Sequence, residues 1–569
     1  MILYTFSTDN AAQQYIHITV EFTASANEHL LQLPSWRPGR YELGNFAKNV
    51  RNFKVFGEGN RKILASKESK DSWKINVKEG EHLKVCYQYY AAELNAGSTY
   101  LSEEQLYVNP VNCCIYITGR EKEDCQIQLN IPPTYQIACA LPKKEGLLLA
   151  ADYDQLADSP WIASRSIQYG SYDVNGVTFH LWFQGEIKVN WEQIINDFSA
   201  FTQKQFEKFS EFPFPSYHFL FQIVPYKAYH GVEHLTSTII LLGPSYDVFT
   251  DFYTELLGVS SHELYHAWNV KSIRPAEMHP YDYTKENYSR LGYLCEGVTT
   301  YMGDLFLLKS SVFSFEQYAL ELSKQLQKHF DNFARFNCSV AEASFDTWLD
   351  GYVPGAPNRK VSIYTEGCLL ALVTDILIIK HSKGKYKLDD VMKSLYFEYY
   401  LQNKGVTEDD YKVMVNRYAM TDLSWLFDDY FYGTRPFESI LSENLEEIGI
   451  ELLHHPVTSY SAGKLGFKSL QQGNNFIVKS IYPGSPAELA NLMLEDEIIA
   501  VNEYSCHGEL DKWLSYFDND EKRLTVLRKG KLQQLTLPEV NRNFYLSYQL
   551  KKTTDPNVHQ RKAYELWSR

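Results

Sequence analysis

A stretch near the middle of the chain carries the side chains best suited to chemistry. It reads Ser-His-Glu-Leu-Tyr-His-Ala-Trp-Asn-Val from Ser261 to Val270. His262 and His266 are four residues apart, so on a helix both imidazoles lie on one face, one turn apart. Two nitrogens in this arrangement can bind one Zn²⁺, and Glu263 can then act as general base on the water that the metal activates. The alternative, a helix with two partly buried histidines, stays open until a third ligand is found.

A candidate for the third ligand lies thirty residues beyond His266. Glu296 stands in an apolar, glycine-flanked stretch from Leu291 to Leu308, which predicts a second helix. This helix cannot continue the first one but suits an antiparallel neighbour. Two histidines and one glutamate leave the fourth position of a tetrahedral zinc open for water, as in hydrolytic sites. The other interpretation of Glu296 is an ordinary surface carboxylate, which an apolar helix does not favour.

A third element precedes both helices. Gly231-Val232-Glu233-His234 forms a predicted loop that leads into the apolar run 235–242, a strand suited to the side of a cleft. Gly231 permits close backbone approach. Glu233 would lie over the metal, where its carboxylate could pair with the free α-ammonium group of a substrate.

These three motifs resemble the glycyl aminopeptidase family of the gluzincin zinc metallopeptidases. The similarity includes the tail Trp-Asn-Val-Lys-Ser-Ile-Arg-Pro at 268–275, more specific than the zinc motif itself, and Glu-Gly-Val-Thr-Thr-Tyr at 296–301. It extends over nearly the whole chain. The resemblance implies an aminopeptidase with one zinc per chain that acts on peptides with a free N-terminus. It also implies a preference for small N-terminal residues such as Gly or Ala.

Two further motifs are similar to those of the family. Tyr364 matches a position where the family has a tyrosine near the zinc, which makes it a candidate donor to the oxyanion of the tetrahedral intermediate. Because the chain has 42 tyrosines, a structural role for Tyr364 stays open. The run Trp36 to Tyr41, Trp-Arg-Pro-Gly-Arg-Tyr, looks like a signature of the N-terminal domain. Its simplest interpretation is a tight turn with an aromatic anchor, and we assign it no chemistry.

Composition narrows the class of protein. At 569 residues, with 44% hydrophobic and 15% aromatic residues, the chain is globular and too long for a single core. The net charge of −15 argues against nucleic acid or an anionic membrane as partner. No apolar run reaches transmembrane length, and the first residues lack the features of a secretory signal. Nine cysteines without a C-x-x-C motif favour reduced thiols, so a cytoplasmic location is expected.

The patterns predict a multidomain α+β protein. Period-two alternation indicates an N-terminal sandwich or saddle, strands followed by the zinc helices indicate a thermolysin-like catalytic domain, and a helical region completes the cleft. The expected segments are 1–165 (N-terminal all-β domain), 166–345 (zinc peptidase domain), 346–455 (helical domain), 456–540 (PDZ-like domain) and 541–569 (C-terminal tail).

The segment 456–540 resembles a PDZ domain. Its Leu465-Gly466-Phe467 turn would offer backbone N–H groups to the C-terminal carboxylate of a peptide, which would add to the sheet as an edge strand. The alternative is a degenerate domain that only packs on its neighbour.

Taken together, the sequence predicts a zinc aminopeptidase. His262, His266 and Glu296 hold the metal, Glu263 is the general base, Tyr364 the candidate oxyanion donor and Glu233 the amine anchor. One rival hypothesis is a zinc endopeptidase on the same scaffold. Another is a PDZ-bearing binding protein whose metal site is a relic. The intact ligand set and general base count against the relic.

Overall fold

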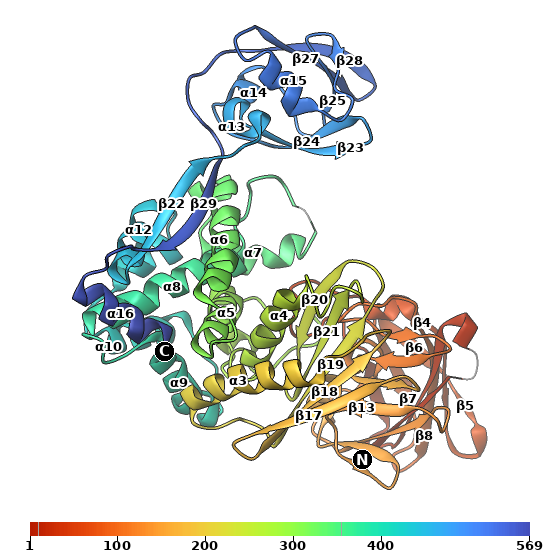
Figure 1. Ribbon diagram of the computed structural model, residues 1–569. Helices are drawn as coiled ribbons and strands as arrows, with labels where there is room; N and C mark the ends of the chain where they lie inside the picture. Colours follow the sequence, from red (N-terminus) through yellow and green to blue (C-terminus); the bar gives the residue numbers. More distant parts are fainter. Residues whose placement is uncertain (9–10, 354) are drawn as a thin grey trace. The chain divides into compact units, whose positions relative to one another are not determined.

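The computed structural model describes residues 1–8, 11–353 and 355–569. The chain forms two compact units. Unit 1 comprises Met1–Tyr318, Phe333–Ile448 and Asn557–Arg569, and unit 2 comprises Ala319–Asn332 and Gly449–Pro556. Strands dominate the first part of unit 1 and helices its later part (Figure 1). The predicted multidomain α+β class is confirmed.

The N-terminal part of unit 1 is rich in strands. One sheet runs in the order β14 (Lys143–Lys144), β15 (Leu147–Ala150), β12 (Cys125–Asn130), β1, β2, β8, β4 (Val50–Phe56) and β5 (Lys62–Ile63). Its centre pairs β1 (Ile2–Ser7) with β2 (Tyr15–Thr23), and β2 with β8 (His82–Tyr90), in antiparallel register. Every second residue of β2 is buried, as the alternating sequence predicts. The predicted β-rich N-terminal domain is confirmed.

A mixed sheet in the order β17-β18-β19-β21-β20 follows. Its strands are β17 (Gln168–Val174), β18 (Val177–Gln184), β19 (Ser216–Ile223), β21 (Ser237–Gly243) and β20 (Ala228–Glu233). The three inner strands are parallel, and β17 and β20 pair antiparallel at the two edges. Strand β21 is buried throughout, which explains why its sequence is continuously apolar.

The residues that we predicted to form a loop, 231–233, lie in edge strand β20 itself. They form a strand because their backbone pairs antiparallel with β21, with Gly231 opposite Ile240 and Glu233 opposite Thr238. A strand holds these residues more rigidly than a loop would, because its backbone is paired with the sheet.

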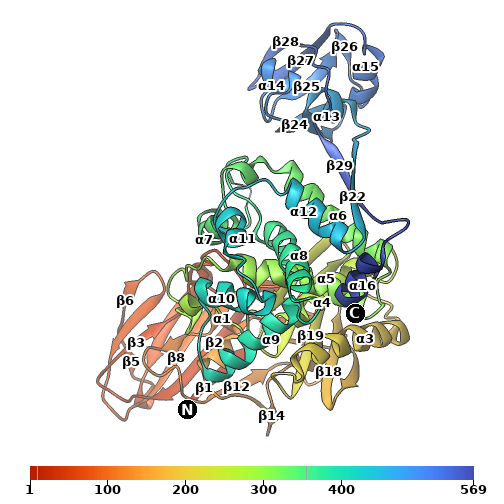
Figure 2. The same cartoon turned by 90° about the vertical axis from the view of Figure 1, so that its left-hand side faces the viewer.

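Two helical segments follow the sheet. Helix α4 (Tyr253–Tyr265) packs on β20, β21 and α5 (Thr299–Lys309). A π-helical segment, η5 (Tyr293–Val298), leads directly into α5. The later helices, seen from another side in Figure 2, are α7 (Val340–Asp350), α8 (Ile363–His381), α9 (Leu388–Glu398), α10 (Glu408–Ala419) and α12 (Glu438–Glu447). The predicted helical region is confirmed.

The segment after residue 541, which we expected to be a tail, forms strand β29 (Leu546–Lys552) and helix α16 (Val558–Ser568). Helix α16 returns to unit 1, where it packs on α8 and α5. Its Trp567 is fully buried, and the indole N–H donates to the hydroxyl of Tyr301 at 2.8 Å. The end of the chain is therefore part of the core of unit 1.

Unit 2 consists of a two-stranded ribbon and a separate sheet. The ribbon pairs β22 (Ile450–Pro456) with β29. The sheet runs in the order β23 (Phe467–Gln472), β24 (Asn475–Ile481), β25 (Glu497–Val501), β27 (Lys522–Arg528) and β28 (Lys531–Leu537), with β26 (Tyr504–Ser505) beside β25. Helix α15 (Leu510–Tyr516) covers its core through Leu510 and Leu514.

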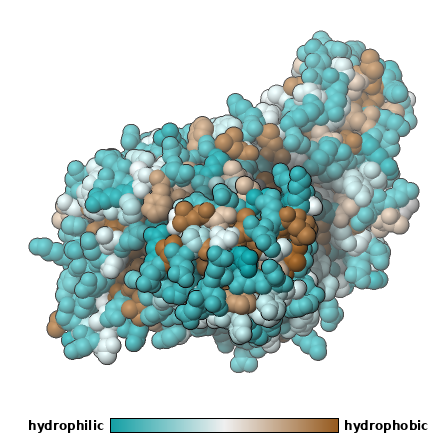
Figure 3. All heavy atoms as spheres, turned by 90° about the horizontal axis from the view of Figure 1, so that it is seen from above, coloured by the Kyte–Doolittle hydropathy of each residue, from teal (hydrophilic) through white to brown (hydrophobic). Residues whose placement is uncertain are grey.

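None of the helices in the described residues is long and apolar enough to span a membrane. On the face drawn in Figure 3, hydrophilic residues predominate and hydrophobic ones form interrupted patches.

Candidate metal centre and active site

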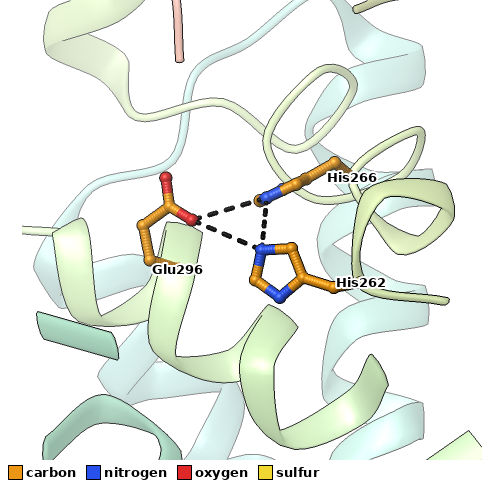
Figure 4. Close-up of side chains that lie close together, drawn as sticks. All are labelled: His262, His266 and Glu296. Atoms are coloured by element: carbon orange, nitrogen blue, oxygen red, sulfur yellow. Dashed lines mark hydrogen bonds and ion pairs between the residues drawn. The ribbon is translucent and has the colours of Figure 1, made fainter. Parts of the chain in front are cut away.

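Three side chains converge from two helical segments. The Nε2 atoms of His262 and His266 lie 3.0 Å apart, and Oε2 of Glu296 lies 3.7 Å and 3.4 Å from them, respectively (Figure 4). Two ligands of a tetrahedral zinc, each at about 2.0–2.1 Å from the ion, stand about 3.3 Å apart. The donor atoms and their spacing therefore fit one zinc ion.

The orientation of His266 depends on the chain that follows it. Its Nδ1–H donates to the backbone carbonyl of Asn269 at 2.6 Å, which leaves Nε2 to face Glu296. The Asn269 amide in turn donates to the carbonyl of Leu294 at 2.8 Å and to the hydroxyl of Thr299 at 3.0 Å. Asn269 thus ties the segment after α4 to the helix that carries Glu296.

Helices α4 and α5 touch through their backbones. A Cβ placed on Gly303 of α5 would lie 3.0 Å from Cα of His262. The hydroxyl of Ser261 donates to the carbonyl of Gly303 at 2.6 Å. This close approach brings the histidines of α4 within reach of Glu296.

Glu296 itself lies in the π-helical segment η5. Such segments inside longer helices are frequent at functional sites. A Cβ on Gly297 would lie 2.3 Å from Cα of Gly367, so η5 crosses α8 with almost no space between them. Tyr364 lies in the first turn of α8. Its hydroxyl lies near that of Tyr352.

Two further carboxylates lie beside the histidines. Donor atoms of Glu233, Glu263 and His266 all lie within 4.8 Å of one another. A Cβ on Gly231 would lie only 2.1 Å from Oε1 of Glu263, so glycine is the residue that leaves room for this carboxylate. The hydroxyl of Thr238 donates to Oε2 of Glu263 at 3.4 Å.

The charges at this site reinforce the metal interpretation. Burial raises the pKa of Glu263 to about 8; His266 opposes this rise, whereas Glu233 and Glu296 add to it. Burial also opposes ionisation of Glu296, but the two histidines lower its pKa to about 2. Three carboxylates crowded into one buried site favour a bound cation, which would offset their repulsion.

A buried carboxylate connects two of the motifs. Asp158 binds Nδ1 of His234 at 3.0 Å, the backbone N–H of Leu235 at 2.8 Å and Nζ of Lys271 at 2.8 Å. Burial opposes ionisation of Asp158, but Lys271 and His234 lower its pKa to about 2. Asp158 therefore joins the strand that carries Glu233 to the tail that follows His266.

Several of these residues were not identified from the sequence as parts of the site. The hydroxyl of Tyr41 donates to Oε1 of Glu296 at 3.1 Å, although we assigned its motif no chemistry. The Trp-Arg-Pro-Gly-Arg-Tyr run marked this segment as distinctive, but it did not indicate that Tyr41 contacts Glu296. Asp158 and Gly303 carried no recognisable signal.

The three residues of the predicted carboxylate-binding turn lie in unit 2. Leu465 ends helix α13 (Tyr460–Leu465), Gly466 has a φ of +72°, and Phe467 begins β23. The backbone N–H of Gly466 donates to the carbonyl of Ser461, so this donor is used within the chain. Carboxylate binding by this turn stays a prediction.

Comparisons with known proteins agree with the geometry. Residues 3–165 match the Peptidase M61 N-terminal domain, and residues 255–370 match the M61 glycyl aminopeptidase domain. These matches support a peptidase. The second match spans the histidine pair, Glu296 and Tyr364.

The chain is also similar to solved structures. An aminopeptidase N family protein from Idiomarina loihiensis is 25% identical over 100% of both chains, with a TM-score of 0.91. An M1 zinc metallopeptidase from Deinococcus radiodurans is 11% identical over 76% of this chain and 94% of that one. Its TM-score is 0.47. None of the curated proteins matches the sequence.

Proposed function

We propose that this protein is a zinc-dependent aminopeptidase that removes small N-terminal residues, such as Gly or Ala, from peptides. The observation that supports it most is the convergence of His262, His266 and Glu296 on one point, with two further buried carboxylates beside them. The M61 glycyl aminopeptidase match, which covers this segment, supports the same activity.

Each residue has a role in this proposal. Zinc, when bound, would supply a Lewis acid that polarises the scissile carbonyl and lowers the pKa of water. The carboxylate of Glu263 accepts a proton from the attacking water and delivers it to the leaving amine. Tyr364 donates a hydrogen bond to the developing oxyanion. Glu233 pairs with the α-ammonium group of the substrate and so sets the position of cleavage.

The test compares substrates with and without a free α-amine. Purified protein should contain about one zinc per chain and cleave an alanyl or glycyl substrate, whereas the N-acetylated counterpart should not be cleaved measurably. Acetylation would leave the buried Glu233 carboxylate without its charged partner. Such a loss costs on the order of 2–5 kcal/mol, which corresponds to a roughly thirty-fold to several-thousand-fold lower rate. If the acetylated peptide is cleaved as fast as its free-amine counterpart, the aminopeptidase proposal is wrong and the endopeptidase hypothesis takes its place.

The domain assignments belong to the same proposal. Residues 166–345 would form a thermolysin-like catalytic domain, because a mixed sheet leads into α4 and α5. Residues 456–540 would form a PDZ-like domain. A hollow of about 570 Å³ between α13, β23 and the start of α15 supports peptide binding there. Binding of a free C-terminal peptide, but not of its amidated form, to the full-length protein tests this role.

A further inference from the structure

We propose that the loop Trp36–Tyr41 of the N-terminal domain is part of the active site, where Tyr41 positions Glu296 and Gly39 positions Glu233. The inference rests on the proposed function, in which Glu296 is a zinc ligand and Glu233 anchors the substrate amine. It concerns residues more than 190 positions before Glu233 in the chain.

The first contact concerns the metal ligand. Tyr41 donates to Oε1 of Glu296 at 3.1 Å, whereas the other oxygen, Oε2, is the one that faces the two histidines. The tyrosine is 6% exposed, and its ring packs edge-on against Trp348 with ring centroids 6.1 Å apart. The hydrogen bond therefore holds one carboxylate oxygen and leaves the other for zinc. Partners of this kind orient a metal ligand and tune its affinity.

The second contact concerns the amine anchor. Gly39 has a φ of +78°, and a Cβ placed on it would lie 2.5 Å and 2.7 Å from the two carboxylate oxygens of Glu233. Any side chain at this position would displace that carboxylate. Burial lowers the pKa of the neighbouring Arg37, and the charge of Glu233 opposes this shift. The loop thus lies directly against the carboxylate that the substrate amine would bind.

The loop is held in place by the rest of unit 1. Trp36 is 1% exposed and packs on Tyr281 and Trp348, with ring centroids 5.5 Å away in both cases. The backbone N–H of Ser35 donates to the carbonyl of Tyr283 at 2.8 Å. An aromatic anchor is therefore present, as the simplest interpretation of the motif expects. What the anchor holds is the part of the loop that contacts Glu233 and Glu296.

The first test measures zinc affinity by competition with a chelator. Tyr41→Phe should bind zinc about 10- to 100-fold more weakly than the wild type, because Glu296 loses its partner. The matched control is Tyr4→Phe, which removes another buried hydroxyl of the same domain, one that donates to the carbonyl of Ile115 at 2.9 Å. This control should keep the wild-type affinity.

Unchanged zinc affinity in folded Tyr41→Phe would overturn the inference while leaving the proposed function intact. The proposed function fails separately, if the wild type binds no zinc or if His262→Ala binds it as tightly as the wild type.

The second test compares two glycines with similar backbones. Gly39→Ala and Gly80→Ala introduce the same strain, since both glycines have positive φ, +78° and +83°, but nothing lies within 4 Å of a Cβ on Gly80. We expect Gly39→Ala to raise KM for free-amine substrates, with a loss of about a hundredfold in kcat/KM and no change in zinc affinity. Gly80→Ala should match the wild type. Equal kinetics of the two variants would contradict the role of Gly39.

Discussion

At the scale of single residues, the site depends on which atom each side chain presents. His266 offers Nε2 because its Nδ1–H is already bonded to the carbonyl of Asn269. The carboxylate of Glu263 can lie beside these side chains because Gly231, which has no Cβ, leaves room for it. Removal of a ligand and removal of the general base should therefore have different effects.

Glu263→Gln should keep about one zinc per chain but lose most turnover, by roughly 10²- to 10⁴-fold, since only the proton transfer is removed. His262→Ala should lose both the metal and the activity. Metal analysis together with steady-state kinetics separates the two effects. Glu255→Gln, a substitution on the same helix α4, serves as the control. A Glu263→Gln protein with near wild-type activity would contradict the mechanism.

At the scale of the elements, close backbone contacts and one buried carboxylate set the geometry. Segment η5 meets α8 at Gly297 and Gly367, and α4 meets α5 at Gly303. Asp158 joins the end of strand β20 to the chain that follows α4. These contacts decide how the motifs meet, so changes here should affect the site without touching a ligand.

Gly297→Ala should lower both the unfolding midpoint and the zinc affinity, because its methyl group would overlap the backbone of Gly367. Gly258→Ala is the matched control on α4, where the nearest atom to a new Cβ is Oδ1 of Asp304 at 3.8 Å. This substitution should be neutral or stabilise the protein by up to about 1 kcal/mol, since alanine is the better helix former. Similar unfolding midpoints for the two variants would show that the contact between η5 and α8 tolerates a side chain at position 297.

Asp158→Asn should lower the free energy of unfolding by about 2 kcal/mol at neutral pH, since a carboxyl whose pKa falls from 3.8 to about 2 gains that much on folding. Because the folded-state pKa is the lower one, this contribution is present above about pH 4 and lost as the pH falls toward 2. Denaturant unfolding of both proteins across this range measures the difference. It should shrink on acidification, whereas a pH-independent difference would rule out the charge as its cause. Asp251→Asn, at an exposed position, is the control.

At the scale of the whole molecule, the chain leaves unit 1 near Ile448 and returns to it at Asn557. The returning helix α16 buries Trp567 against Tyr301. Removing everything after Pro456 would therefore delete part of the core of unit 1 as well as most of unit 2.

We expect a chain that ends at Pro456 to be unfolded or insoluble. Excision of 457–545 should be tolerated instead, with Pro456 joined to Leu546 through an Asn-Gly turn, because these two residues lie opposite each other in the β22–β29 ribbon. The excised protein should keep its zinc and hydrolyse dipeptide-sized substrates. Zinc content, thermal unfolding and dipeptide kinetics provide the comparison. Loss of folding in the excised protein would favour a packing role for the removed segment.

The sequence by itself determined the parts of this protein that depend on local order. Two histidines four residues apart share a helix face wherever that helix lies, so His262, His266 and the adjacent Glu263 were recognisable without a structure. Alternating apolar residues likewise predicted the N-terminal strands, because such strands bury one face. A continuous apolar run predicted strand β21, because this strand is buried on both faces.

Only the tertiary structure decided what these parts meet. Tyr41 reaches Glu296 across 255 positions, and no periodicity links two residues so far apart. Gly303 and Gly297 lie at close helix contacts, but the sequence alone does not distinguish them from other glycines, because the contacts involve residues from other segments. The sequence predicted a C-terminal tail in place of helix α16, because the space that buries Trp567 is created by other helices. Contacts between distant segments depend on how the whole core packs, so they cannot be inferred from the local sequence around either residue.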